Sequence, residues 1–375
     1  MATLFRDLQT KGKVIIMLAV ILVVVLMYHI SFPYKKLSYP APARSKTKQD
    51  HSPSTSVVGK QPNSTQVIQN TDKPVLLLWF WPENKRFDFQ DCKTLFQIDS
   101  CHLTDDRSLY TTAQEVLVFH NAIQDDLSNL PTPPRPRFQR WIWFNTASPN
   151  NTRRITGIQG LFNLTMSYRR DADIHVCWRL TLKKDVDADF VLPKKERLLC
   201  LIIDRGDPHT QPWKSYYEDL TKHIKVDVFS SLSASFSKSK SYFQTVSGCK
   251  FYLSFETSTH RDYITESFNG PLAAGTVPIA FGPPRRNYED LAPGSSFIHV
   301  DDFPNATKLV KFLLRLDKDH DAYMRYFDWR RFYTARRHPT EENRQFAHAI
   351  CQACDHVGKN RVYRVVPDLY KWFLI

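Results

Sequence analysis

The chain has 375 residues, of which 42% are hydrophobic and 13% aromatic. This is enough apolar material for a sizeable core in roughly two to three domains, and it excludes a disordered or fibrous protein. The formal net charge is +13, but residues 1–73 alone contain ten Lys/Arg against three Asp/Glu. Because the positive charge is concentrated in this N-terminal part, it does not indicate a nucleic-acid partner, and none is expected.

The N-terminal part contains an uncharged apolar segment at residues 14–32. Its length is close to the roughly 20 residues that a helix needs to span a bilayer. A cleaved signal peptide is the alternative, but residues 28–33 (YHISFP) offer no small-residue cleavage site. The sequence therefore predicts a cytoplasmic tail at 1–13, a transmembrane signal-anchor at 14–32 and an unpacked stem at 33–73 rich in Pro, Ser, Thr and Lys.

Four Asn-X-Ser/Thr acceptors for N-linked glycans occur in the chain, at Asn63, Asn150, Asn163 and Asn305. The chain also has seven cysteines, enough for three disulfides and one odd thiol. Together with the signal-anchor, these features predict a single-pass type II membrane protein with its body in the lumen of the secretory pathway.

From residue 74 onward, short apolar runs of strand length alternate with helical or loop stretches. Expected strands, in chain order, are 75–81, 115–119, 140–144, 198–203, 226–229, 251–255, 277–281 and 297–300, and expected helices are 302–316, 319–333 and 339–350. Such alternation favours parallel sheets covered by helices, an α/β fold. The pattern predicts two Rossmann-like lobes, an N-terminal one at 74–210 and a C-terminal one at 211–375. The boundary is expected near 205–220, where Gly206, Pro208 and Pro212 cluster.

The segment from residue 249 to 303 carries the clearest chemistry, with a strand, a loop, a helix and a second strand in order. A helix N-terminus that faces strand ends favours a phosphate group. Glu266 in the first helical turn could accept ribose hydroxyls, or it could be an ordinary N-terminal helix charge. Arg285 or Arg286 could reach an anionic ligand, or either could be a solvated surface charge.

This segment resembles the donor-binding motif of the animal α-1,3-fucosyltransferases, and the resemblance covers nearly all of residues 74–375. Further blocks that carry it are Leu78–Trp81 with Pro82, Cys101–Thr104, Asp106–Leu109, Arg140–Trp143, Phe162–Thr165, Ser167–Asp171 and the tail Cys351…Cys354-Asp355-His356.

The resemblance implies a Golgi membrane enzyme of the B-type glycosyltransferase architecture, a fucosyltransferase that glycosylates protein- or lipid-linked glycans. Its expected donor is GDP-fucose, and its expected acceptor is N-acetylglucosamine of lactosamine-type glycans, with inversion at the sugar carbon. A carboxylate removes the acceptor proton while GDP departs, without a metal or other cofactor. The expected donor-binding residues are Tyr252, Tyr263, Glu266, Trp178 and Arg205. A homodimer is one expected association.

Several positions depart from the family pattern at sites of chemistry. Ala147 occupies the position of the family's general base, a glutamate, so the catalytic residue is unknown; Glu83 and Asp204 are candidates to replace it. Ser267 occupies the position of the lysine that faces the pyrophosphate. Gly270-Pro271 lies some six residues into the helix after the donor loop, so that helix is expected to be kinked or to begin later.

By resemblance, the disulfides are expected to join Cys92 with Cys351, Cys101 with Cys354, and Cys200 with Cys249, leaving Cys177 free. The alternative for Cys351-x-x-Cys354 is a zinc or redox site. No histidine pair has metal-ligand spacing, and no metal is expected.

Two interpretations of the function remain at this stage. The first is an active fucosyltransferase that has rebuilt its base and pyrophosphate contacts. The second is a catalytically degenerate relative that binds a glycan or a partner enzyme without transfer.

Overall fold

A computed structural model describes residues 73–184, 190–203, 211–230 and 242–374. The chain divides into two units, residues 1–67 and 68–375, and only the second is described here. Among the described residues, no helix is long and apolar enough to span a bilayer. The expected tail, anchor and stem, with Asn63, lie outside the described residues.

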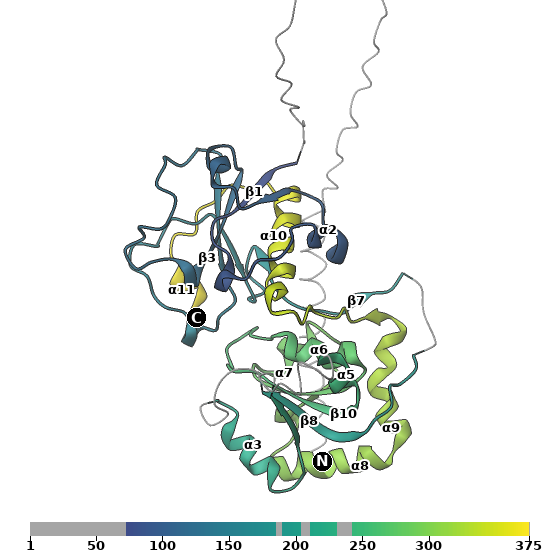
Figure 1. Ribbon diagram of the computed structural model, residues 1–375. Helices are drawn as coiled ribbons and strands as arrows, with labels where there is room; N and C mark the ends of the chain where they lie inside the picture. The colour runs from purple at the N-terminus through teal and green to yellow at the C-terminus, as the bar shows by residue number, and fades with distance from the viewer. Residues whose placement is uncertain (1–72, 185–189, 204–210, 231–241, 375) are drawn as a thin grey trace, which may run out of the picture. The chain divides into compact units, whose positions relative to one another are not determined.

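Two parallel sheets form the framework of the second unit (Figure 1). The first has the order β2-β1-β3-β4-β5-β6 and consists of β1 (Val75–Leu78), β2 (His102–Thr104), β3 (Glu115–Phe119), β4 (Arg140–Asn145), β5 (Leu164–Ser167) and β6 (Ile174–His175). The second has the order β12-β11-β10-β8-β9 and consists of β8 (Arg197–Ile203), β9 (Asp227–Ser230), β10 (Cys249–Phe255), β11 (Val277–Phe281) and β12 (Ile298–His299). Every pairing inside both sheets is parallel, as the alternation of strands and helices predicts.

The change from one sheet to the other falls earlier in the chain than expected. Strand β8 pairs with β9 and β10, so it belongs to the second sheet. Its assignment to the first half of the chain, with a boundary near 205–220, was therefore wrong. An apolar run shows that a strand is buried but not which sheet it joins, and this information comes only from the pairing.

Helices cover both faces of each sheet. They are α2 (Asp91–Phe96), α3 (Lys214–Thr221), α5 (Tyr242–Ser247), α6 (Glu266–Ala274), α7 (Arg285–Glu289), α8 (Ala306–Lys318), α9 (His320–Met324), α10 (Ala347–Lys359) and α11 (Leu369–Phe373). On β10, Phe251 and Leu253 pack with α8 and α9, whereas Tyr252 packs with α5 and α6. This alternation is the two-residue period of a strand buried on both faces.

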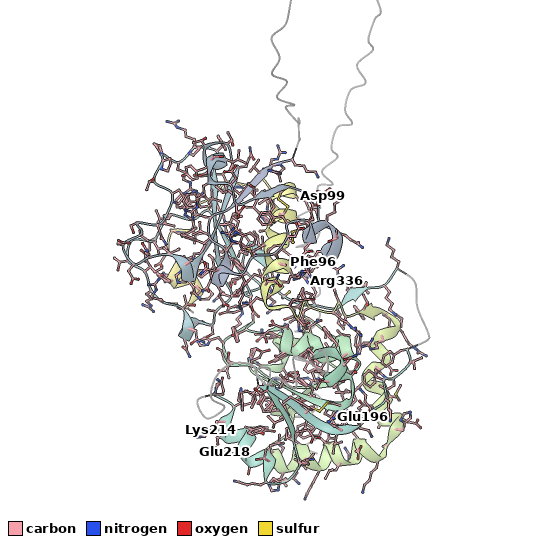
Figure 2. All side chains as sticks on the ribbon, in the orientation of Figure 1. Phe96, Asp99, Glu196, Lys214, Glu218 and Arg336 are labelled. Atoms are coloured by element: carbon pink, nitrogen blue, oxygen red, sulfur yellow. A yellow bond between two sulfur atoms is a disulfide. The ribbon has the colours of Figure 1, made fainter. Side chains whose placement is uncertain are left out.

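The C-terminal part of the chain returns to the first sheet after β13 (Tyr333–Thr334) pairs antiparallel with β7 (Thr181–Leu182). The guanidinium of Arg336 lies 5.9 Å from the centre of the Phe96 ring in α2, and both side chains are labelled in Figure 2. Helix α10 then packs on the face of the first sheet that α2 also covers. A helix was expected at 339–350, but α10 begins only at Ala347 and continues through both tail cysteines.

The three expected disulfides are present and confirm the predicted pairing. Cys92 joins Cys351 and Cys101 joins Cys354, with Cα–Cα distances of 5.2 and 5.3 Å. Cys200 joins Cys249 across adjacent strands, and Cys177 is a buried free thiol. The first two bridges hold α10 against α2 and β2. The helix comes so close there that a Cβ on Gly358 would lie 2.5 Å from the Ser100 carbonyl oxygen.

Candidate functional site

The N-terminus of α6 lies at the centre of the second sheet, where the sequence predicts the sugar-nucleotide donor. Helix α6 follows β10, which is the middle strand of the order β12-β11-β10-β8-β9. Thr265 caps the helix, because its side chain accepts a hydrogen bond from the backbone N–H of Ser267. Glu266 is exposed in the first turn, where a carboxylate interacts favourably with the helix dipole. The positive end of a helix dipole favours a phosphate, although the Thr265 and Ser267 backbone nitrogens already donate to Glu256 and to the Thr265 hydroxyl.

Glu256 is a buried carboxyl group at this helix end and was not among the predicted site residues. It is 2% exposed, and its Oε1 accepts hydrogen bonds from the Thr265 backbone nitrogen (2.9 Å) and the Ser267 hydroxyl (3.0 Å). Burial raises the pKa of Glu256 to about 7, against the lowering effect of these hydrogen bonds. Gly282 packs directly against Glu256, since a Cβ added at Gly282 would lie 3.0 Å from the Glu256 Cβ.

Ser267 stands where the family resemblance leads one to expect the lysine that faces the pyrophosphate. Its hydroxyl donates to Glu256 and accepts from the Thr265 hydroxyl (3.0 Å). The position therefore supplies no positive charge to a phosphate, and its hydroxyl is already engaged within the protein.

Helix α6 contains Pro271 and still begins at Glu266, so the expectation of a later start was wrong. A proline in a helix leaves the carbonyl four residues earlier without its N–H partner. That carbonyl belongs to Ser267, and it accepts a hydrogen bond of 2.8 Å from the Ser254 hydroxyl on β10. The neighbouring strand thus replaces the donor that proline lacks.

The predicted donor-binding residues do not all lie at this helix end. Tyr263 precedes α6; it packs edge-to-face on Tyr168 of the first sheet's loops, and its hydroxyl lies 3.2 Å from the Thr257 hydroxyl. Tyr252 is 3% exposed and packs in the core beside the Cys200–Cys249 bridge and α6. Trp178 stacks on His348 of α10 with 4.1 Å between ring centres. Arg205 lies outside the described residues.

The loops that follow β5 and β10 are joined by a polar network that the sequence did not reveal. Buried Asp262 accepts hydrogen bonds from the Arg170 Nε (3.0 Å) and the Asn287 Nδ2 (2.7 Å). Arg170 also pairs with Asp290. The only available signal was that Arg170 lies in the block Ser167–Asp171, which resembles a family motif. The network fixes the loop before α6 relative to the carboxyl end of the first sheet.

Ala147 lies just beyond the carboxyl end of β4 and is half-buried. Its backbone nitrogen donates to the Asn145 Oδ1 at 3.1 Å, and its methyl side chain cannot accept a proton. Glu83, one candidate replacement, follows β1, and β3 separates β1 from β4. Two strand spacings amount to about 10 Å. Glu83 is also engaged with Lys85 and Gln345, which makes it a poor substitute at Ala147. Asp204 lies outside the described residues.

Arg205, Arg285 and Arg286 are the candidates to replace the missing cation, and Arg205 lies outside the described residues. Arg285 is held by Glu289 (2.9 Å), Asp302 and the Gly294 carbonyl, so its charge is already neutralised. Arg286 is exposed on α7 and has no ion pair among the described residues. Within the same part of the chain, no group of three or more His, Cys, Asp or Glu side chains is arranged to hold a metal ion.

The predicted glycosylation sites differ in accessibility. Asn150 and Asn305 are exposed, and both remain predictions. Asn163 is 1% exposed, and its Nδ2 donates to the Arg364 carbonyl at 2.5 Å while its Oδ1 accepts from the Trp141 backbone nitrogen. A glycan on that nitrogen would replace its hydrogen bond to the Arg364 carbonyl, and glycosylation of Asn163 stays a prediction.

Comparisons with known proteins agree on one family. The family model "Fucosyltransferase, N-terminal" matches residues 71–179, and the family model "Glycosyltransferase family 10 (fucosyltransferase) C-term" matches residues 192–372.

The chain is 42% identical over 302 residues to 4-galactosyl-N-acetylglucosaminide 3-alpha-L-fucosyltransferase 9 of Rattus norvegicus and of Homo sapiens, covering 80% of this chain and 82% of each relative. It is 37% identical over 305 residues to the FUT5 enzyme of Homo sapiens, covering 80% and 79%. A solved α1,3-fucosyltransferase with GDP-fucose is 14% identical, with a TM-score of 0.49 over 80% of this chain and 96% of that one. The two family models and the identity to the curated relatives show that the chain belongs to glycosyltransferase family 10, the fucosyltransferases.

Proposed function

We propose that this protein transfers fucose from GDP-fucose to the 3-hydroxyl of N-acetylglucosamine in lactosamine-type glycans on glycoproteins or glycolipids. The observation that carries the proposal is the 42% identity over 302 residues to enzymes named for this reaction. The intact β10–α6 unit supports it, with a capped helix N-terminus and exposed Glu266 at the expected place.

The reaction is a single displacement with inversion. The acceptor oxygen forms a bond to the fucose anomeric carbon, while the bond from that carbon to the β-phosphate oxygen breaks and GDP leaves. The acceptor proton passes to a base. The positive end of the α6 dipole stabilises the negative charge that develops on the pyrophosphate, and Glu266 accepts hydrogen bonds from ribose hydroxyls. Exposed Arg286 on α7 supplies a further positive charge, and its substitution can test whether that charge contributes to donor binding.

Two site features favour a second candidate, a family member that binds donor or acceptor glycan without efficient transfer. Ala147 offers no base, and general-base catalysis typically contributes 10²–10⁴-fold. Ser267 is neutral and is hydrogen-bonded to Glu256. The two candidates predict the same ligands and differ only in turnover.

The proposed location is the Golgi lumen, with a single-pass type II anchor at 14–32. Three disulfides support an oxidising compartment, because such bridges persist in secreted and lumenal proteins. The anchor, the stem at 33–73 and a homodimer rest on the sequence and the family alone.

The test uses the full-length protein in detergent, with GDP-fucose and N-acetyllactosamine. Calorimetry measures donor affinity, and mass spectrometry measures the fucosylated product. We expect Glu266→Ala to weaken GDP-fucose binding by about 10- to 100-fold, the value of hydrogen bonds to a charged group. Glu218→Ala on the exposed surface of α3 is the matched control and should bind as the wild type does.

The outcomes separate the candidates. Donor binding with product formation supports the transferase, and donor binding without product favours the second candidate. Absence of GDP-fucose binding in the wild type would overturn both.

A further inference from the structure

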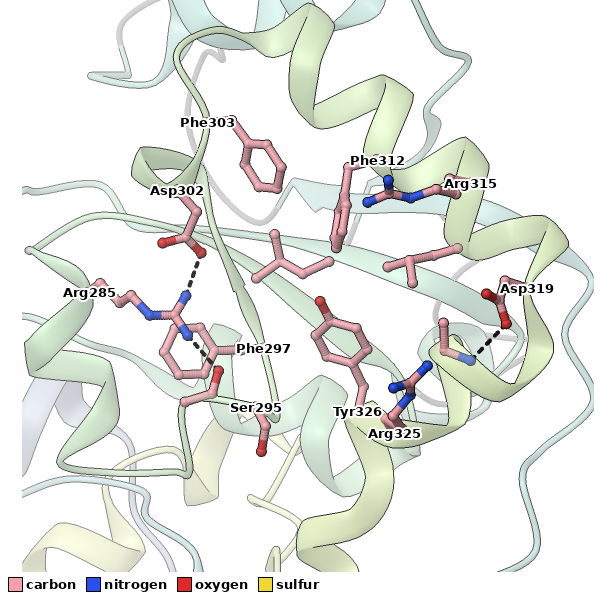
Figure 3. A pocket seen from close by; sticks show the side chains of 14 residues that line it. Arg285, Ser295, Phe297, Asp302, Phe303, Phe312, Arg315, Asp319, Arg325 and Tyr326 are labelled. Atoms are coloured by element: carbon pink, nitrogen blue, oxygen red, sulfur yellow. Dashed lines mark hydrogen bonds and ion pairs between the residues drawn. The ribbon is translucent and has the colours of Figure 1, made fainter.

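A cavity of about 700 Å³ lies at the edge of the second sheet, away from the strand that carries the proposed donor site (Figure 3). It is lined by residues around β12 and from α7, α8, α9 and the following 3-10 turn Arg325–Arg331. β12 is the outermost strand, separated from β10 by β11. The volume is within the range of small-molecule sites, which extends over roughly 300–1,000 Å³.

Aromatic rings from three elements form much of the wall. Phe297 precedes β12, and Tyr326 belongs to the 3-10 turn Arg325–Arg331. Phe303 lies just before α8, and Phe312 lies within that helix. In Figure 3 the Tyr326 hydroxyl is directed into the space between these rings. Among the described residues this hydroxyl has no hydrogen-bond partner. The cavity therefore offers flat apolar faces together with a polar group inside it.

The residues that line the cavity include three arginines and two aspartates. Arg285 is neutralised by Asp302 and Glu289, and the Asp319 carboxylate caps α9 by accepting from the Ala322 nitrogen (2.9 Å). Arg315 and Arg325 are exposed at the rim, and neither forms an ion pair with any described residue. The Arg315 guanidinium lies 5.3 Å from the centre of the Phe312 ring. Two free guanidinium groups thus stand beside an aromatic cavity.

We propose that this cavity binds a sugar that carries an anionic group, a carboxylate or a sulfate, as an accessory site for acidic glycans. Guanidinium groups bind such anions through paired N–H donors, and the flat C–H face of a pyranose fits against aromatic rings. A ring with hydroxyls also supplies a partner for the Tyr326 hydroxyl. The choice of a sugar among anionic ligands rests on the proposed function. The presence of the cavity and of its two exposed arginines does not depend on that function.

The experiment measures binding to the full-length protein by calorimetry. The probes are N-acetylneuraminic acid, which carries a carboxylate, galactose 3-sulfate, and neutral N-acetylgalactosamine. The test variant is Arg315→Ala/Arg325→Ala, and the matched control is Lys311→Ala, which removes an exposed charge from the same helix without lining the cavity. GDP-fucose affinity is measured on every variant.

We expect one or both anionic sugars to bind the wild type and the Lys311→Ala control. The double arginine variant should bind at least tenfold more weakly and lose the salt dependence, and GDP-fucose affinity should not change. The two anionic probes distinguish carboxylate from sulfate. Equal binding of the neutral sugar, no binding of either anionic sugar, or binding unaffected by loss of both arginines would overturn the proposal. Because the donor is measured separately, failure here is distinguishable from failure of the proposed transferase.

Discussion

Glu256 links the stability of the donor region to pH. Burial raises the pKa of its carboxyl to about 7, from an ordinary value of 4.5. The folded state therefore holds the proton more tightly than the unfolded state does. The free energy of unfolding is highest below about pH 4.5 and falls as the pH rises to about 7, where the folded carboxyl ionises.

This dependence can be isolated by substitution. In the wild type, we expect the free energy of unfolding to fall by about 3 kcal/mol between pH 4.5 and 7.5, since one pKa unit corresponds to 1.36 kcal/mol. The Glu256→Gln variant should not show this fall. Urea denaturation of both proteins across this range measures it. Parallel stability curves for wild type and variant would show that Glu256 does not titrate in this interval.

Individual site residues were only partly predictable from the sequence. The position of Glu266 in the first turn of a helix is confirmed, because it follows from local sequence alone, and its role toward the donor stays a prediction. The motif did not identify Glu256 as a buried acid, because its burial depends on Gly282 at the end of the neighbouring strand β11. Tyr252 and Trp178 were assigned to the donor by resemblance, and this role stays a prediction. The sequence did not reveal that their rings pack against α5, α6 and α10.

Within α6, the pairing of Pro271 with Ser254 explains how the helix continues through a proline. The Ser254 hydroxyl supplies the hydrogen bond that the Ser267 carbonyl would otherwise lack. We expect Ser254→Ala to lower the free energy of unfolding by about 1–3 kcal/mol, the cost of a buried polar group left without a partner.

The matched background for that prediction is Pro271→Ala, which restores a backbone N–H to the same carbonyl. In this background, Ser254→Ala should cost less than half as much, and chemical denaturation of the four proteins in the cycle measures the coupling. Equal costs in the two backgrounds would show that the hydroxyl and the proline act independently.

Strands were easier to predict than their partners or the shorter elements. The runs at 115–119 and 277–281 coincide with β3 and β11, since both are continuous apolar segments. β5 (Leu164–Ser167) was missed because it alternates with polar residues. The Thr165 hydroxyl donates to the Asp173 carboxylate, so the strand is buried without being apolar. The start of α10 was misplaced because the helix is defined by packing on the first sheet.

At the scale of the whole molecule, two disulfides attach helix α10, near the C-terminus, to elements more than 250 residues earlier. We expect the double variant Cys92→Ser/Cys351→Ser to lose about 2–4 kcal/mol in the free energy of unfolding, as is typical for long-loop bridges. Denaturation under non-reducing conditions measures the loss.

Cys177→Ala is the control, because this buried thiol forms no disulfide. A double variant no less stable than this control would show that the Cys92–Cys351 bridge adds nothing beyond the packing of α10 and the remaining Cys101–Cys354 bridge.

The sequence anticipated the two-sheet architecture and the disulfide pairing, because both follow from alternation of elements and from family resemblance. It could not locate the change of sheet, which depends on strand pairing. Nor could it reveal the Asp262 network, whose members are distant in sequence and meet only in the fold.

The most direct test of the account compares fucose transfer by the wild type with transfer by Ala147→Glu, using GDP-fucose and N-acetyllactosamine. The control is Ala147→Gln, because a glutamine side chain has nearly the same size as a glutamate side chain but cannot accept the acceptor proton. We predict slow transfer by the wild type, a kcat at least 100-fold higher for Ala147→Glu, no gain for Ala147→Gln, and unchanged donor affinity in all three. No product from any of the proteins would contradict the assignment as a transferase, and equal rates for all three would contradict the place of the missing base at Ala147.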